Sequence, residues 1–371
     1  MKKFLLFLCF SLFITSQSQV INLNSYVKSD GSDAFKKALD AIKKEYSAKK
    51  KHVVLYIPAG TYTLKEPIIL NKYISLEGES GASTILQVTN PNQEGIILEE
   101  NKNEGDIYNA YNSIKNLTIT GPDFGKNASE WKDLKRNNPK SVGIKVLGLR
   151  NRIENCTIDG FLWSGILISS SYYNYLTNNF IKNNRIGITI DNNSTSAFIS
   201  NNEIRNNSSG ILIQNNSYAN FINNNLIENN ITNMLSELKN DDDQTVLSKG
   251  NGIILNQAMN NFIQNNYFEQ QYTNISLINA NDNEISSNFF ALGNVNNRSQ
   301  NIFKLNGKSE RNKIEQNQTM GSTTAIDATK IYISKDGNYS SNIVDFGKEK
   351  NDQIKNKIRN SRNEKQIPQI R

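Results

Sequence analysis

The sequence predicts an all-β fold, a parallel β-helix in which short strands stack coil upon coil. Two repeated patterns predict it. One has an apolar residue, Asn two positions later and an apolar residue five positions later, as in IKNLTI (Ile114), IENCTI (Ile153), LTNNFI (Leu176), ISNNEI (Ile199), INNNLI (Ile222) and IQNNYF (Ile263). ISSNFF (Ile285) aligns with them, with Ser287 at the Asn position. The other begins with Gly, as in GIKV (Gly143), GILI (Gly165), GITI (Gly187), GILI (Gly210) and GIIL (Gly252). Without insertions, both recur every 22 or 23 residues.

A unit of this length cannot bury its own apolar side chains, so successive units must stack into one core. The period is too short for a propeller blade, which needs about 40 residues, and it lacks the 3.6-residue pattern of helical solenoids. Stacked strands lie about 4.8 Å apart. This predicts two columns of structural asparagines, whose amides donate and accept along the stack. One is Asn116, Asn155, Asn178, Asn201, Asn224 and Asn265, and the other is Asn112, Asn151, Asn174, Asn220, Asn261, Asn283 and Asn312, interrupted by Ala197.

The segment DGSDAFKKALDAIKKEY predicts a helix over residues 33–46 that caps the solenoid. Ser32 or Asp33 can cap its N-terminus. Its apolar residues share one face, Phe35, Ala38, Leu39, Ile42 and Tyr46. Such a helix covers the core and the strand edges that the first coil would otherwise expose. The helix therefore belongs to the β-helix domain, which we expect to span residues 20–321.

The two ends of the chain differ from the repeats. Residues 1–19 carry two Lys followed by an apolar run, which indicates a secretory signal peptide; the run is too short to span a membrane. Residues 322–371 leave the pattern and predict a C-terminal cap and a basic tail. The net charge of +7 resides mostly in this tail and in the signal peptide, which argues against a nucleic-acid partner. We therefore expect an exported protein.

Together, the helix at 33–46, the segments VLYIPAGTYTL and LEGESGASTIL, and the Asn-containing coils resemble the pectate-lyase-like right-handed parallel β-helix family. The resemblance covers roughly residues 25–320. It implies right-handed coils and a polysaccharide cleft whose floor is the Gly strand. It leaves the chemistry open, because one fold hosts many activities.

Two insertions interrupt the repeat at the same turn, just before the Gly strand. They are GPDFGKNASEWKDLKRNNPK and ITNMLSELKNDDDQTVLSKGN. They lie four coils apart, about 19 Å at strand spacing. We expect them to project on one side and to wall a groove, with the strand glycines facing outward as its floor.

Candidate site residues follow from this arrangement. Trp163 is a candidate platform for a sugar ring. The other expected substrate-binding residues are Lys145, Asp159, Arg205, Gln214, Glu228 and Glu269. The column Asp159, Lys182, Arg205, Glu228 and Glu269 also has a purely structural interpretation, as a solvated row of weak ion pairs.

The favoured reaction is β-elimination at a uronic acid, which requires neutralisation of a carboxylate and a base near the ring carbon. Lys182 and Arg185 are the candidates for these roles. The resemblance implies calcium as well, held by Asp191 or by acids of the insertions, although the metal stays open. A base role demands an unusual environment, because Lys titrates near pH 10 and Arg above pH 12.

Three alternatives remain. Hydrolysis requires two carboxyl groups about 5–9.5 Å apart, a spacing that Glu228 and Glu269 satisfy in adjacent coils. Epimerisation is disfavoured, because the only His, His52, precedes the repeats and the family's Asp-Pro-His-Glu motif is missing. A non-catalytic glycan-binding protein is the third. Cys156 lies within a repeat and is expected to fill the core. The oligomeric state stays open.

Overall fold

The computed structural model describes residues 19–27, 34–46, 51–100, 111–123, 141–231, 250–291, 294–295, 298–299, 301–320, 331–333, 341–345, 352 and 369–370. Most of both insertions, residues 124–140 and 232–249, lies outside these ranges. The prediction that they wall a groove therefore stays a prediction. The same holds for residues 1–18 of the expected signal peptide.

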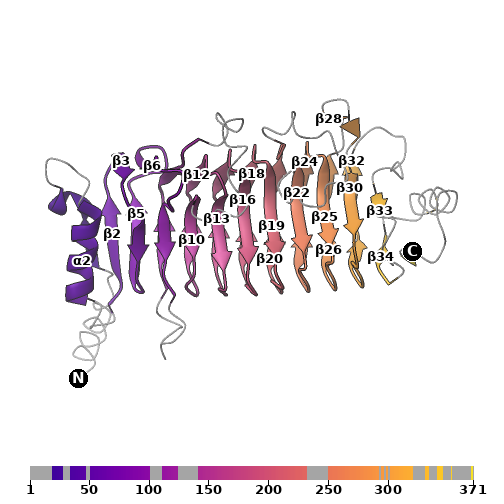
Figure 1. Ribbon diagram of the computed structural model, residues 1–371, viewed down its shortest axis with the longest axis horizontal. Coiled ribbons are helices and arrows are strands. Elements are labelled where there is room, and N and C mark those ends of the chain that lie inside the picture. The colour runs from indigo at the N-terminus through magenta and orange to yellow at the C-terminus, as the bar shows by residue number, and fades with distance from the viewer. Residues whose placement is uncertain are drawn as a thin grey trace, which may run out of the picture.

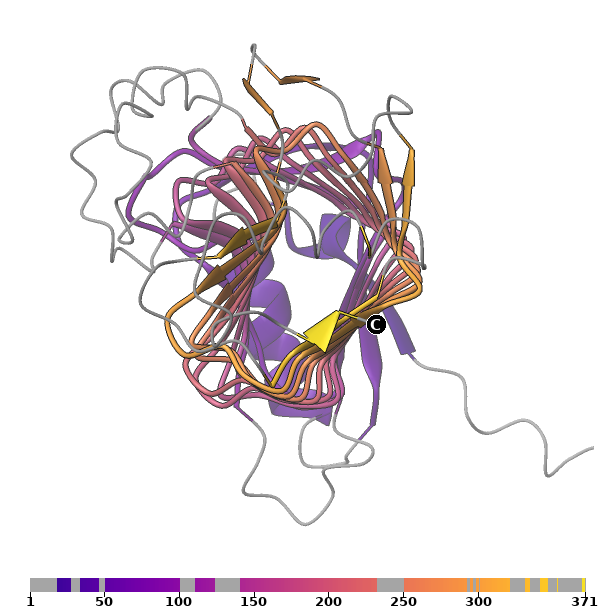
Figure 2. The same ribbon diagram turned by 90° about the vertical axis from the view of Figure 1, so that its right-hand side faces the viewer.

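Three long parallel sheets wind along one axis and enclose a single core, as in a right-handed parallel β-helix (Figures 1 and 2). Each regular coil contributes one strand to each sheet. Sheet A comprises β1 (Gln19–Asn22), β2 (Val53–Ile57), β5 (Ile74–Gly78), β8 (Ser113–Lys115), β11 (Arg152–Glu154), β14 (Tyr175–Thr177), β17 (Phe198–Ser200), β20 (Phe221–Asn223), β23 (Phe262–Gln264), β26 (Glu284–Ser286), β31 (Lys313–Glu315), β34 (Ile343–Val344) and β35 (Gln369–Ile370).

Sheet B follows sheet A within each coil. It comprises β3 (Gly60–Leu64), β6 (Thr84–Val88), β9 (Thr118–Thr120), β12 (Thr157–Asp159), β15 (Phe180–Lys182), β18 (Glu203–Arg205), β21 (Leu226–Glu228), β24 (Tyr267–Glu269), β27 (Phe289–Ala291) and β32 (Gln318–Met320).

Sheet C has the longest strands of the regular coils. It comprises β4 (Ile68–Leu70), β7 (Ile96–Leu98), β10 (Val142–Val146), β13 (Ser164–Ser169), β16 (Ile186–Asp191), β19 (Ser209–Gln214), β22 (Asn251–Asn256), β25 (Thr273–Ile278), β30 (Asn301–Asn306) and β33 (Ile331–Ile333). A separate hairpin joins β28 (Asn294–Val295) to β29 (Arg298–Ser299). The sheets thus continue beyond residue 321, where the sequence pattern ends.

The predicted register is confirmed. The first apolar residues of the Asn pattern pair from coil to coil in sheet A, in the order Ile114, Ile153, Leu176, Ile199, Ile222, Ile263 and Ile285. They are fully buried in the core. On the outside of the same strands, the rings of Tyr175, Phe198, Phe221 and Phe262 stack with centroids 4.9–5.1 Å apart. We call these four rings the aromatic stack.

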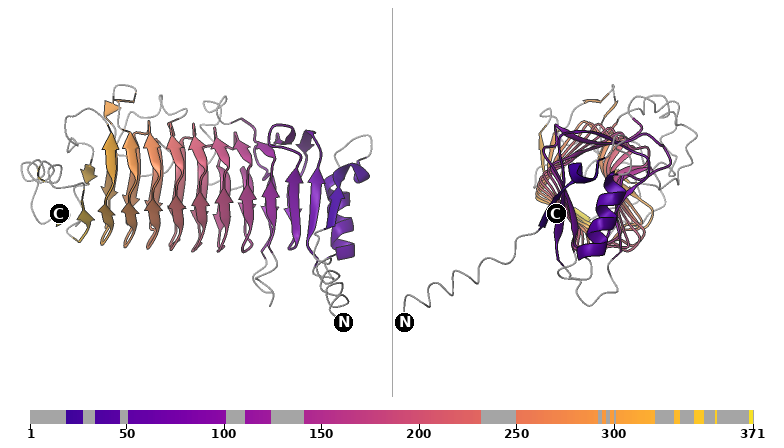
Figure 3. Two further views of the ribbon diagram at one scale, coloured as in Figure 1. Left: turned by 180° about the vertical axis from the view of Figure 1, so that it is seen from behind. Right: turned by 90° about the vertical axis from the view of Figure 1, so that its left-hand side faces the viewer.

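The N-terminal helix is also confirmed. It is α2 (Ala34–Tyr46), preceded by the 3-10 helix η1 (Leu23–Tyr26). It buries Phe35, Ala38, Ile42 and Tyr46 against the core and packs Leu39 at the edge. The helix lies across the open N-terminal end of the coils (Figure 3). None of the helices in the described ranges is long and apolar enough to cross a membrane.

Asparagine ladders occupy the corners, but one of them differs from the prediction. At the corner from sheet A to sheet B, Asn178 and its equivalents adopt left-handed conformations, with φ of 56° at Asn178, and most are exposed. The buried ladder is formed by the next residue of each coil. There, the side-chain oxygen of each Asn accepts a hydrogen bond from the backbone N–H of the equivalent residue in the preceding coil, at 2.9–3.0 Å. The ladder begins at the N–H of Cys156 and continues through Asn179, Asn202, Asn225, Asn266, Asn288 and Asn317. The first predicted column is therefore offset by one residue.

The second predicted column is buried and hydrogen-bonded as expected, at the corner from sheet C to sheet A. It is interrupted at Ala197 and extends to Asn342. A third ladder, at the corner from sheet B to sheet C, was not predicted. It runs from the N–H of Phe161 through Asn184, Asn207 and Asn230.

The expectation that the strand glycines face outward is wrong. A Cβ placed on Gly165 would lie 3.1 Å from the core atom Ile181 Cγ2 and 2.8 Å from the carbonyl oxygen of Gly187. Ile166, the next residue, also belongs to the core. The chain turns from sheet B into sheet C here, so alternation of side chains begins only after the glycine. The outer surface of sheet C is therefore formed by other residues than those expected.

Candidate functional site

The outer face of sheet C carries a central line of paired residues that we call the middle row, Lys145, Leu167, Thr189, Leu212, Ile254 and Ser276. From Leu167 to Ser276 all are buried, with exposures of 0–5%. Leu212 and Ile254 pack with Ile186 and Ile278 in a cluster separate from the core. This buried strip is not an open floor for a sugar chain.

Lys145 is half-buried at the N-terminal end of the middle row. Its Nζ lies 3.3 Å from Glu94 Oε1. Sequence analysis did not single out Glu94, which lies in the coil before Lys145. Pairing satisfies the Lys145 charge locally, so its expected substrate-binding role stays a prediction.

Beside the middle row, at the C-terminal ends of the strands, lies the polar row, Ser169, Asp191, Gln214 and Asn256. All four are half-buried and so remain accessible. Asp191 Oδ2 accepts from Gln214 Nε2 at 3.1 Å, and Asp191 Oδ1 accepts from Asn215 Nδ2 at 2.7 Å. The row therefore offers a carboxylate, a hydroxyl and amides in a line parallel to the solenoid axis.

Trp163 and Arg185 meet at the opposite end of the strands, at the corner from sheet B to sheet C. The guanidinium carbon of Arg185 lies 5.4 Å from the centre of the Trp163 ring, a cation–π contact. Both side chains are half-buried. This contact occupies one face of the indole, so a sugar would have to use the other face.

The charged column lies on the outer face of sheet B, and its coil-to-coil register is as predicted. Lys182 Nζ is 3.6 Å from Asp159 Oδ2. Arg205 Nη1 lies 3.0 Å from Glu203 Oε1 and 3.8 Å from Glu228 Oε2. Both cations also approach the ring of Phe180, which the sequence analysis missed. The structural interpretation of this column, a row of ion pairs, matches these contacts.

Glu269 continues this column and binds a tyrosine. Tyr267 donates its hydroxyl to Glu269 Oε2 at 2.8 Å. This hydrogen bond raises the pKa of Tyr267 to about 12, with smaller effects from desolvation and from the Glu269 and Glu228 charges. Glu228 and Glu269 are paired residues of β21 and β24, so they lie about 5 Å apart. They meet the shorter carboxyl spacing that hydrolysis requires, but on sheet B.

The structure does not bring the three expected catalytic residues together. Lys182 lies on sheet B, Arg185 stands at the corner and Asp191 ends the sheet C strand. Arg185 and Asp191 are six residue steps apart along an extended strand, about 20 Å. Their catalytic roles stay predictions.

Calcium does not fit the described surroundings of Asp191. Ca²⁺ takes 6–8 oxygen ligands, often from several carboxylates. Around Asp191 the neighbours at hydrogen-bonding distance are N–H donors, from Asn192, Gln214 and Asn215. Within the described ranges, no three acidic, His or Cys side chains cluster as metal ligands.

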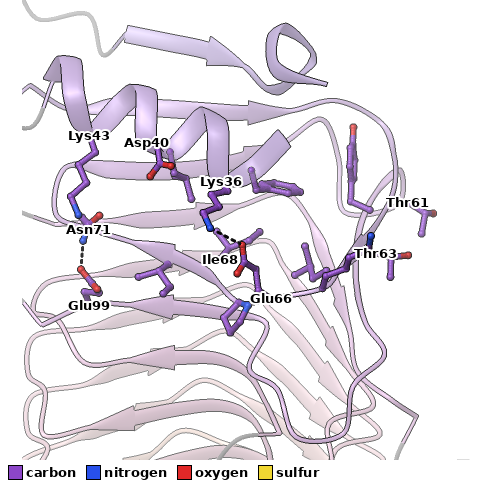
Figure 4. A pocket seen from close by; sticks show the side chains of 16 residues that line it. Lys36, Asp40, Lys43, Thr61, Thr63, Glu66, Ile68, Asn71 and Glu99 are labelled. Atoms are coloured by element: carbon purple, nitrogen blue, oxygen red, sulfur yellow. Dashed lines mark hydrogen bonds and ion pairs between the residues drawn. The ribbon is translucent and has the colours of Figure 1, made fainter. Parts of the chain in front are cut away.

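A cavity of about 590 Å³ lies away from all these residues, at the N-terminal end. It is bounded by α2 and by the β3–β4 segment, with Lys36, Lys43, Glu66 and Glu99 at its rim (Figure 4). Lys36 Nζ lies 3.9 Å from Glu66 Oε1, and Asn71 donates to Glu99. Its rim carries both cations and carboxylates, so the charge of the lining does not indicate whether a ligand would be anionic or cationic.

Cys156 and His52 behave as structural residues. Cys156 is 2% exposed in the core, and burial raises the pKa of its thiol to about 12. The expectation that it fills the core is confirmed. His52 Nε2 lies 2.9 Å from the carbonyl oxygen of Tyr111, and desolvation lowers the pKa of the ring.

The model of one protein family, described as rhamnogalacturonase A/epimerase, pectate lyase-like, matches residues 24–236, more than half of the chain. The chain belongs to this family. No curated protein matches it. Membership in the rhamnogalacturonase A/epimerase family agrees with the resemblance drawn from the repeats.

Solved structures similar to the chain share its fold at low sequence identity. DFA-IIIase from Arthrobacter chlorophenolicus A6 without its lid has a TM-score of 0.65 and 12% identity, covering 96% of this chain and 99% of that one. The Yersinia enterocolitica family 28 exopolygalacturonase has a TM-score of 0.63 and 12% identity, over 89% and 71%. ORF18 of Geobacillus virus E2 has a TM-score of 0.55 and 14% identity; the match covers 86% of this chain but only 61% of that protein. At these identities the likeness shows the fold alone.

Proposed function

We propose that this protein is polysaccharide-active and binds its glycan lengthwise along the polar row of sheet C. The main support for this placement is that the polar row is accessible to solvent, whereas the middle row beside it is buried. Its hydroxyl, carboxylate and amide groups can hydrogen-bond sugar hydroxyls. They recur at coil spacing, about 4.8 Å, as an extended polymer requires. Membership in a family described by polysaccharide enzymes supports the substrate class.

We propose β-elimination at a uronic acid as the reaction. It would take place at the Trp163–Arg185 corner, about 20 Å from Asp191 of the polar row along the strand, so the glycan would have to reach across sheet C from the polar row to that corner. Arg185 is the group best suited to neutralise a uronate carboxylate, because its planar guanidinium can bind a carboxylate bidentately. Trp163 beside it offers an apolar surface to the same sugar. Lys182 would be the proton acceptor. It is ion-paired with Asp159, so it would have to leave that pair before it could act as a base.

Two other proposals compete with β-elimination. Hydrolysis would use Glu228 and Glu269, whose spacing suits a retaining reaction, and would place the glycan on sheet B. A non-catalytic binder would use the polar row without any reaction. The ion pairs that already satisfy Lys145, Lys182 and Arg205 favour this binder over catalysis by those residues.

Affinity electrophoresis in gels that contain polygalacturonate or a neutral galactan tests binding. We expect retardation of the protein, and its loss when Gln214→Ala and Asp191→Ala are combined. Asn223→Ala, a half-buried polar residue on the outside of sheet A, is the matched control and should migrate like the unaltered protein. Unchanged retardation of the double variant would exclude the polar row as the binding surface.

Ultraviolet absorbance of unsaturated uronate products tests the reaction. We expect absorbance to grow with polygalacturonate and to be lost in Arg185→Ala. Reducing ends that appear without this absorbance would indicate hydrolysis instead, and Glu228→Gln should then abolish them. Binding without any cleavage, weakened by Trp163→Ala, would establish the non-catalytic binder.

We further infer that the protein is exported through its N-terminal segment. The Lys-led apolar run of residues 1–19 supports this. N-terminal sequencing of protein collected outside the producing cell should find the chain beginning near Val20. An intact Met1 in that fraction would contradict cleavage.

A further inference from the structure

A shallow hollow of about 490 Å³ lies where sheet C turns into sheet A, next to the polar row. Three tyrosines line it, together with Asn192, Asn193 and Thr195 among others. Two of these tyrosines, Tyr173 and Tyr218, expose 41% and 43% of their surface. Exposed rings that lie together, unlike single exposed apolar residues, form the kind of patch that marks a binding surface.

The backbone spaces two of the rings as the walls of a slot. Tyr172 pairs with Thr195, and Thr195 pairs with Tyr218, in parallel β-bridges between successive coils. Tyr172 and Tyr218 are therefore two coils apart, about 9.6 Å at strand spacing. The residue between them is the small Thr195, which leaves room for a flat ring between two aromatic walls.

Neighbouring side chains contact the rings of Tyr172 and Tyr173. The ring of Tyr173 meets that of Tyr172 edge-to-face, with centroids 5.5 Å apart. The guanidinium of Arg150 lies 5.0 Å from the centre of the Tyr173 ring. A ring that is already fixed loses little conformational entropy when a ligand binds.

The polar groups of the hollow are uncharged amides, hydroxyls and backbone groups. Asn192 donates from Nδ2 to Ser169 Oγ at 3.0 Å, which joins the hollow to the polar row. The backbone N–H of Asn193 donates to the carbonyl oxygen of Asn215, but among the described residues neither the Asn193 side-chain amide nor the Tyr218 hydroxyl has a hydrogen-bond partner. None of the described residues that line the hollow carries a charge.

We propose that this hollow is a subsite for one uncharged pyranose residue of a glycan. The apolar face of a pyranose packs against tyrosine rings, and its hydroxyls match the Asn193 amide and the Tyr218 hydroxyl. Arg150 stacks on the ring of Tyr173 but is not among the residues that line the hollow, so the described lining offers a uronate carboxylate no cation and favours a neutral sugar. The proposal rests on the proposed function in one respect, since the bound residue would belong to a glycan that also follows the polar row.

Saturation-transfer difference NMR on the full chain tests the subsite. The probes are the methyl glycosides of galactose, glucose, mannose and rhamnose, with methyl galacturonoside as the charged comparison. We expect transfer to at least one neutral glycoside and weaker transfer to the galacturonoside. Tyr218→Thr should weaken the binding about three- to tenfold, the range that one aromatic contact contributes.

The variants are chosen to keep the fold. The ladder of Tyr172, Thr195, Tyr218, Met259 and Asn281 already holds polar, apolar and aromatic side chains at equivalent positions. Thr at position 218 repeats the residue of the preceding coil. Thr195→Tyr fills the slot and should abolish binding, whereas Tyr218→Thr only weakens it. Tyr111→Thr removes a tyrosine that is 37% exposed elsewhere and should leave binding unchanged.

Two results would overturn the proposal. One is transfer to none of the neutral glycosides; the other is transfer that survives both Tyr218→Thr and Thr195→Tyr. A separate outcome would refute only the proposed binding along the polar row. If Gln214→Ala with Asp191→Ala leaves polymer retardation intact while Tyr218→Thr weakens transfer and Thr195→Tyr abolishes it, the subsite stands and the lengthwise path along sheet C does not.

Discussion

Replacing one amide of the ladder between sheets A and B should destabilise the protein far more than replacing its sequence neighbour. Asn202 is 2% exposed. Its Oδ1 accepts the N–H of Asn179 at 3.0 Å, and its Nδ2 donates to the carbonyl of Leu176 at 2.9 Å. In Asn202→Ala, the buried N–H of Asn179 has no acceptor, which costs about 1–3 kcal/mol, and the lost bond to Leu176 adds about 1 kcal/mol. We expect a loss of roughly 2–4 kcal/mol on this basis.

Asn201→Gly is the matched control. Asn201 is exposed and has a φ of 57°, a left-handed conformation that glycine adopts freely. Its substitution should cost less than about 1 kcal/mol. Urea unfolding followed by far-ultraviolet circular dichroism measures both variants, with midpoints compared at equal slope. Equal losses in the two variants would refute the assignment of the buried ladder to Asn202.

Three further predictions concern packing and ionisation. Gly187→Ala should destabilise by about 1–3 kcal/mol through overpacking, because its Cβ would lie 2.6 Å from a carbonyl oxygen of the next coil, whereas Gly81→Ala meets nothing closer than 3.7 Å; equal urea midpoints would contradict the inward direction of the glycine. Tyr267 should ionise only near pH 12 in an ultraviolet titration, so its contribution to stability is full below pH 10 and falls as pH rises through about 12, and Glu269→Gln should lower that pKa; an unchanged titration would exclude the hydrogen bond as its cause. Cys156 should resist alkylation at pH 8 in the native protein and react in urea, as peptide-resolved mass spectrometry can show, since its thiol is buried with a pKa of about 12; rapid native labelling would be inconsistent with that burial.

The coil register was predictable because a fixed period forces equivalent residues into contact. Aligning Ile153, Leu176 and Ile199 by sequence alone reproduces their pairing in sheet A. The buried ladder was misplaced by one residue because asparagines occur in pairs, as in Asn178–Asn179. Both members suit a corner, and only the backbone conformation distinguishes the left-handed outer one from the buried inner one.

The site was less predictable than the fold. Strand alternation could not reveal that both Gly165 and Ile166 face the core, because this depends on where the chain turns between sheets. Charged residues were identified correctly as a column, but the sequence does not show that Lys182 and Arg185 point to different partners. The hollow was missed because its tyrosines belong to no repeated motif. Tyr172 and Tyr218 occupy equivalent positions two coils apart, and the sequence period could have revealed this.

A crystal structure of the protein with a bound neutral or acidic oligosaccharide would show directly where the glycan lies. We predict sugar residues along the polar row, Ser169 to Asn256, with one ring between Tyr172 and Tyr218. Sugar bound instead on the aromatic stack of sheet A, or across the charged column of sheet B, would contradict it.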